Sequence, residues 1–209
     1  ATALPALIGM SAKLLMNKTD ILMLAPLGTM DDVGLYGAAF RLIYLQIVPV
    51  MVLSTVITPR LSGAFSAGRV AEGRRLYHGA LIFAAALSVP LAGLLIAVPG
   101  PILALVFGAA YAPAGPVLAV LAAAQVAAAL AIPATSLMLM TGRQVAFGQM
   151  TVLALAVNIA ANLALIPPLG PLGAALATAL SMVLLSGAQL VSCARILRSG
   201  RFREEAPQP

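Results

Sequence analysis

Residues 115–140 read GPVLAVLAAAQVAAALAIPATSLMLM, and no charged residue interrupts them. A helix crosses the hydrocarbon core of a bilayer with roughly 20 apolar residues, because the core is about 30 Å thick and each residue rises about 1.5 Å. Similar stretches recur along the chain, so we predict an all-α, polytopic membrane protein with six transmembrane helices. The expected spans cover residues 3–27, 34–58, 79–98, 115–140, 145–166 and 172–194.

The composition excludes the main alternatives to a membrane protein. Of the 209 residues, 62% are hydrophobic and 9% are charged, whereas soluble domains have about 45–50% and about 25%. The chain is also too apolar to be disordered, and its single cysteine, Cys193, excludes a disulfide scaffold. In a membrane protein the net charge of +6 is no sign of nucleic-acid binding, because the position of the charges decides their meaning.

Basic residues are distributed unequally between alternate connections. Nine of the twelve lie in segments 59–78 and 141–144 and in the tail, and they are Arg60, Arg69, Arg74, Arg75, Arg143, Arg195, Arg198, Arg201 and Arg203. Cytoplasmic loops are enriched in Lys and Arg, so we predict that both ends of this segment are cytoplasmic. Residues 1–194 would form a transmembrane lobe, and 195–209 a basic cytoplasmic tail. The first span opens the chain without a basic flank or an initial methionine, so we expect a longer protein.

Proline residues divide the helices further. Pro49, Pro90 and Pro133 lie inside expected spans and should kink them, because proline lacks a backbone donor. The sequence Pro99-Gly100-Pro101 should end the third span. The apolar segment 102–108 that follows is too short to cross a bilayer, so we expect a short interfacial or re-entrant helix at the outer face.

Charged residues inside the spans are the main functional signal: Lys13, Lys18, Asp20 and Arg41. Such residues are costly in lipid and normally face a bundle interior or a wet cavity. The spacing of Lys13, Asn17 and Asp20 places them on one helical stripe. Arg41 is expected on the same side of its span as Tyr44, and Lys18 points away from the stripe.

Two interpretations of these charges remain open. In the first, Asp20 forms a structural ion pair with Lys13 or Arg41, and Arg41 reaches the outer interface. In the second, the three bases exceed the one acid, so the unpaired cations line a cavity that binds an anionic substrate. Asn158 and Asn162, four residues apart with Thr151 roughly in line, could bridge helices or line that cavity.

Little in the sequence supports catalysis, so we predict that the chain is not an enzyme. His78 is the only histidine, and no cluster of cysteine and histidine suits a metal. No glycine-rich nucleotide motif is present, and Ser11, Ser54 and Ser136 have no histidine nearby in the sequence. We therefore expect no cofactor and no metal.

Several short segments follow one another along the chain in a set order. They are NKTDILML at 17–24, VGLYGAAFRL at 33–42, PRLS at 59–62, VFG at 106–108, YAPA at 111–114, TGR at 141–143, Asn158 to Asn162, LIP at 165–167, Gly170 and GAA at 173–175. In this order they resemble the C-terminal half of O-antigen and exopolysaccharide translocases, which are lipid-linked oligosaccharide flippases of the multidrug/oligosaccharidyl-lipid/polysaccharide exporter superfamily.

The resemblance implies a two-lobed transporter in the bacterial cytoplasmic (inner) membrane, of which this chain is one lobe. Its substrate would be an oligosaccharide on undecaprenyl pyrophosphate, a precursor of lipopolysaccharide or exopolysaccharide, moved between leaflets by alternating access. Its partners would be the lipid-linked oligosaccharide, the bilayer, the N-terminal lobe, and possible polymerase and glycosyltransferase partners. The cationic residues would hold the pyrophosphate. Two alternatives stay open: a multidrug/cation antiporter of the same superfamily, which would need carboxylates such as Asp20, and a membrane scaffold for glycosyltransferases.

Overall fold

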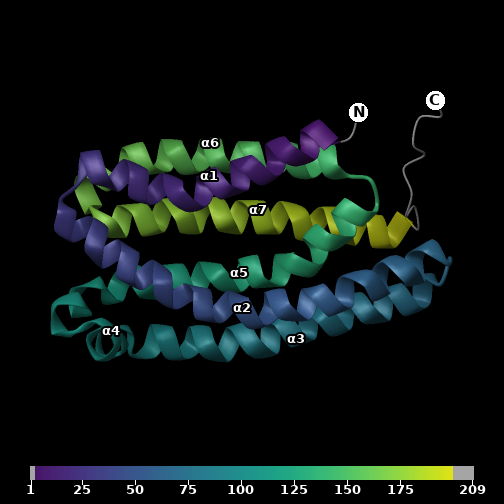
Figure 1. The fold of residues 1–209 in the computed structure, drawn as a ribbon, viewed down its shortest axis with the longest axis horizontal. Helices are drawn as coiled ribbons and strands as arrows, with labels where there is room; N and C mark the ends of the chain where they lie inside the picture. The colour runs from purple at the N-terminus through teal and green to yellow at the C-terminus, as the bar shows by residue number, and fades with distance from the viewer. Residues whose placement is uncertain (1–2, 200–209) are drawn as a thin grey trace.

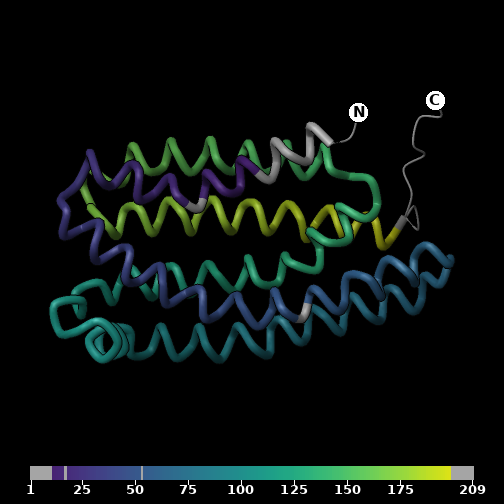
Figure 2. The backbone as a smooth tube through the Cα atoms, viewed as in Figure 1, coloured from purple at the N-terminus to yellow at the C-terminus, as the bar shows by residue number. Residues whose placement is uncertain are grey.

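The computed structural model describes the backbone of residues 3–199, and the side chains of residues 11–198 apart from 17 and 53 (Figure 2). All regular secondary structure within this part of the chain is helical, which confirms the prediction of an all-α protein. The elements are α1 (Ala3–Leu27), α2 (Met30–Ser66), α3 (Val70–Ala97), α4 (Pro99–Phe107), the 3₁₀ helix η1 (Ala109–Ala114), α5 (Gly115–Met140), α6 (Gln144–Leu169) and α7 (Pro171–Ser199).

The long helices form two groups that meet along one seam (Figure 1). Helix α1 packs on α6, and α6 packs on α7; helix α2 packs on α3 and α5, and α3 also packs on α5. The contact between α5 and α7 joins the two groups. The α1–α2 turn, α4 and the α6–α7 turn lie at one end of the bundle, while the α2–α3 and α5–α6 turns lie at the other. We call these the turn end and the basic end.

Five of the described helical segments are long and apolar enough to cross a membrane: Met30–Ser66, Val70–Ala97, Ala109–Met140, Gln144–Leu169 and Pro171–Arg198. Helix α1 is not among them, because Lys13, Lys18 and Asp20 place three charges in its middle and C-terminal parts. A multi-pass membrane protein is therefore supported, and a sixth crossing by α1 stays a prediction.

The helices extend beyond three of the expected span boundaries. The segment 59–78 is mostly helix, since α2 continues to Ser66 and α3 begins at Val70. At about 1.5 Å per residue, the 37 residues of α2 extend about 55 Å, well beyond the hydrocarbon core. Helix α7 likewise continues to Ser199, so the tail predicted from residue 195 begins as helix. Arg201 and Arg203 lie outside the described residues.

The turn between α1 and α2 is short because a capping box begins α2 directly after it. Asp32 N–H donates to the Thr29 hydroxyl oxygen at 3.2 Å, and Thr29 N–H donates to Asp32 Oδ2 at 2.9 Å. These bonds satisfy backbone donors that a helix start otherwise leaves free. Helix α2 therefore begins only three residues after α1 ends.

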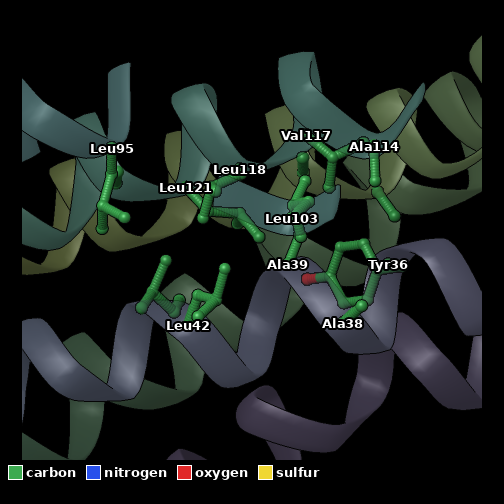
Figure 3. Packing of buried hydrophobic residues seen from close by; sticks show 14 of the residues in the cluster. Tyr36, Ala38, Ala39, Leu42, Leu95, Leu103, Ala114, Val117, Leu118 and Leu121 are labelled. Atoms are coloured by element: carbon green, nitrogen blue, oxygen red, sulfur yellow. The ribbon is translucent and has the colours of Figure 1, made fainter. Parts of the chain in front are cut away.

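The short helix expected near 102–108 is present as α4, which Pro99 opens at a position where no backbone donor is needed. Its Leu103 is fully buried in the main hydrophobic cluster. Figure 3 shows that cluster, where Tyr36 of α2 lies near Leu103 of α4 and Val117 of α5, and Leu42 of α2 faces Leu118 and Leu121 of α5. The largest hydrophobic cluster among the described residues thus lies at the turn end of the bundle.

Helices α6 and α7 approach closely at Gly173. A Cβ atom at this position would lie 2.0 Å from the backbone oxygen of Leu165, which cannot move aside without shifting α6. We predict that Gly173→Ala lowers the free energy of unfolding by about 1–3 kcal/mol or more, as overpacking does. Thermal unfolding of the purified full-length protein measures this. The matched control is Gly187→Ala on the same helix, where no atom lies within 4 Å of the added Cβ. Equal losses in both variants would contradict the prediction.

Candidate functional site

A cavity of about 450 Å³ lies between α1 and α2, with α5 and α7 forming its back wall. It exists because α1 and α2 are joined by the short turn but pack on different groups, α1 on α6 and α2 on α3 and α5. Its apolar lining includes Met16, Phe40, Ile43, Ile47, Met51, Ile132, Met182 and Leu185. Its polar lining consists of Lys13, Asp20, Tyr44, Ser54, Gln125, Thr135, Ser136, Thr178, Ser186 and Gln189.

Lys13 supplies a positive charge to this cavity. Its side chain lines the wall and remains accessible. Among the described side chains there is one ion pair, between Arg69 and Glu72 at 3.1 Å. Lys13 therefore pairs with no described carboxylate. A cation in such a place is available to an anionic ligand.

Asp20 lies on the same wall but is only 1% exposed. Its Oδ2 accepts a hydrogen bond from the Tyr36 hydroxyl at 2.8 Å. Its Oδ1 accepts from Asn162 Nδ2 at 2.9 Å and from Asn158 Nδ2 at 3.2 Å. The ion pair with Lys13 or Arg41 that was considered for Asp20 is absent from the described side chains, and neutral donors satisfy the carboxylate instead.

This network joins four helices. Asp20 comes from α1, Tyr36 from α2, the two asparagines from α6, and Thr178 from α7 lies 3.4 Å from the Tyr36 hydroxyl. Asn158 and Asn162 are fully buried and also bonded to each other, with Asn162 Nδ2 donating to Asn158 Oδ1 at 3.1 Å. Both asparagines therefore bridge helices, behind the cavity wall rather than on it. Thr151, also buried, donates to the Phe147 carbonyl at 2.8 Å.

The structure places the remaining predicted residues at different sites, some on the cavity wall and some away from it. Tyr44 lines the cavity, whereas Arg41 and Lys18 are exposed and lie outside the described lining. The side chain of Asn17 lies outside the described residues. The structure therefore brings Lys13, Asp20 and Tyr44 to one cavity and does not bring Arg41 to it.

Sequence reasoning missed Tyr36, Thr178, Gln125 and Gln189. The two glutamines carried a usable signal, because each is a polar side chain in a largely apolar helix, where polar groups normally serve packing or a cavity. Tyr36 carried none, since a tyrosine near a helix end is ordinary at a membrane interface.

Comparison with known families now bears on this site. The family described as polysaccharide biosynthesis protein matches residues 3–116, more than half of the chain. The chain belongs to this family. The matched region runs from α1 to the start of α5 and contains Lys13, Asp20, Tyr36 and Tyr44. Membership supports a polysaccharide flippase-type protein and so confirms the family resemblance predicted from the sequence. A search of curated proteins found no significant match.

Proposed function

We propose that this chain is one lobe of a transporter that flips undecaprenyl-pyrophosphate-linked oligosaccharide from the inner to the outer leaflet of the bacterial cytoplasmic membrane. The observation that carries the proposal is Lys13, an unpaired cation on the wall of a cavity inside a helical membrane bundle. A pyrophosphate is the anion that such a cation would hold. Family membership supports a role in polysaccharide biosynthesis.

The shape of the lobe supports entry of substrate from the basic end. Helices α1 and α2 meet at the turn end and diverge toward the other (Figure 1). The volume of about 450 Å³ lies within the range of small-molecule sites, about 300–1,000 Å³, although a second lobe would enlarge it. Under the predicted orientation we therefore expect the cavity to be accessible from the cytoplasm, where lipid-linked precursors would be loaded.

A cation antiporter has weaker support. It would need a free carboxylate in the cavity, and Asp20, the described lining residue that carries one, already accepts three hydrogen bonds. A drug-efflux phenotype without a polysaccharide defect would favour this alternative.

The proposed function is tested by deleting the gene for the full-length protein and restoring it on a plasmid. We expect the deletion to abolish surface polysaccharide and to leave lipid-linked oligosaccharide accumulated in the inner leaflet. Surface polysaccharide is measured by immunoblot, and lipid-linked oligosaccharide by mass spectrometry of extracted lipid. Normal surface polysaccharide in the deletion strain, together with loss of a coprecipitated glycosyltransferase, would indicate a scaffold instead.

The predicted orientation is tested by cysteine labelling in the full-length protein, after Cys193→Ala removes the native thiol. We expect an impermeant thiol reagent added outside intact cells to label Asp31→Cys, Ala110→Cys and Leu169→Cys at the turn end. It should not label Ala67→Cys at the basic end until the membrane is opened. All four positions are exposed in the structure, so access depends on the side of the membrane. Labelling of Ala67→Cys from outside would reverse the orientation.

A further inference from the structure

Two glutamines in the back wall of the cavity have unused hydrogen-bond donors. Gln125 on α5 and Gln189 on α7 are 3% and 2% exposed. Both line the cavity, and the Nε2 atom of each has no hydrogen-bond partner among the described residues. Buried donors are nearly always paired, because an unpaired one loses its bond to water without replacement.

A third glutamine shows what a purely structural amide looks like in this bundle. Gln46 is fully buried and lies outside the cavity lining. Its Nε2 donates to the carbonyl oxygens of Ser88 and Ala122, at 3.2 Å each, and so ties α2 to α3 and α5. The free Nε2 groups of Gln125 and Gln189 serve no comparable contact.

Gln189 contacts a neighbour on α5. The Thr135 hydroxyl lies 3.2 Å from Gln189 Oε1 and 3.0 Å from the Ala131 carbonyl, and it donates its single proton to one of these two oxygens. Gln189 Nε2 has no hydrogen-bond partner among the described residues. Thr135 is ten residues beyond Gln125, or about 15 Å along α5. The two free donors therefore lie at different depths of the same wall.

Neutral donors and a cation suit different parts of one ligand. A phosphate group is held by charged hydrogen bonds, which Lys13 can provide. The hydroxyl and carbonyl oxygens of a sugar are neutral acceptors, and amide N–H groups in a buried wall bind them without leaving a charge unpaired. We propose that Gln125 and Gln189 form a saccharide subsite that binds sugar oxygens of the lipid-linked oligosaccharide, separately from its pyrophosphate. This inference rests on the proposed function.

The test measures binding of two lipids to the purified full-length protein in nanodiscs by native mass spectrometry. One probe is undecaprenyl pyrophosphate without sugar, and the other is the same lipid carrying the oligosaccharide repeat extracted from host cells. Gln125→Met and Gln189→Met keep side-chain length and remove the amide. We expect each to weaken binding of the sugar-bearing lipid by about tenfold, the loss expected for a buried hydrogen bond, and to leave binding of the sugar-free lipid unchanged.

Two controls distinguish loss of a saccharide subsite from a general loss of stability or of lipid binding. Gln46→Met makes the same change outside the cavity and should lower thermal stability without changing the ratio of the two affinities. Lys13→Ala should weaken the binding of both lipids. If the glutamine variants weaken the binding of both lipids equally, or of neither lipid, the saccharide-subsite proposal is wrong while the proposed function stands. If the wild-type protein binds neither lipid, the proposed function fails and the subsite fails with it. Should a methionine variant not fold, Gln189→Asn, which stays polar but withdraws the donor, should reproduce the selective loss.

Discussion

Replacing Lys13 by alanine in the full-length protein is expected to reduce export of surface polysaccharide about tenfold to a hundredfold. A charged hydrogen bond to a phosphate oxygen contributes about 1.5–3 kcal/mol, which corresponds to that change in affinity. Lys13→Glu should abolish export, because a carboxylate in the cavity repels the pyrophosphate. Lys13→Arg keeps the charge and should remain partly active. Quantitative immunoblotting of surface polysaccharide, normalised to the amount of protein in the membrane, measures each effect.

Two comparisons make this prediction specific to the cavity. Arg41→Ala removes a positive charge from an exposed position outside the described lining, so it should reduce export less than Lys13→Ala. The double variant Lys13→Ala with Asp20→Asn removes both charges of the proposed structural pair. Since Asp20 bonds to neutral donors and not to Lys13, we expect this variant to stay inactive. Full export by the double variant would show that Lys13 serves only to balance Asp20.

Removing the Asp20 carboxylate is expected to have the largest effect on folding. Asp20→Ala leaves the Tyr36 hydroxyl and the amides of Asn158 and Asn162 without their acceptor in a buried site. Each unpaired buried donor costs about 1–3 kcal/mol, so we expect a loss of about 3 kcal/mol or more and little protein in the membrane. Fluorescence-detected size-exclusion chromatography of the full-length protein, with and without heating, measures the amount and stability of the fold.

Graded variants identify which bonds matter. Asp20→Asn keeps the shape and one acceptor but places a third NH₂ group beside those of Asn158 and Asn162, so its stability should be intermediate. Tyr36→Phe removes the bond to Asp20 at 2.8 Å and the longer one to Thr178 at 3.4 Å, and should cost about 1 kcal/mol. Asp31→Asn is the matched control, because Asp31 is exposed at the start of α2 and should change stability by less than about 1 kcal/mol. If Asp20→Ala is as stable as Asp31→Asn, the network does not hold the four helices together.

The sequence predicted the helices well because apolar runs of membrane length leave few alternatives. It did not predict where α2 ends and α3 begins. Beyond the bilayer, contacts with neighbouring helices help to keep a helix folded. Here α3 packs closely against α2 because Gly73 has no side chain. A Cβ atom at Gly73 would lie 2.5 Å from the ring of Phe65 on α2. Such support comes from contacts between helices and leaves no periodic mark in the sequence.

The site was predicted in part for a similar reason. The stripe of Lys13 and Asp20 follows from helix geometry alone, and both residues do line the cavity. The partners of Asp20 come from two other helices, α2 and α6. Those on α6, Asn158 and Asn162, are more than a hundred residues away in the chain. Counting charges suggested a pairing with Lys13 or Arg41, but neutral donors can satisfy a carboxylate as fully as a cation does. Only the folded arrangement distinguishes these possibilities.

The short turn and the capping box keep α1 and α2 close together at one end of the bundle. Thr29 and Asp32 pair across the first turn of α2, and the largest buried cluster surrounds the same end. Under the proposed function this end would act as a fixed pivot, and cargo would enter between the far ends of the two helices, on one side of the membrane. Release to the opposite side would then require the whole bundle to tilt as a rigid body.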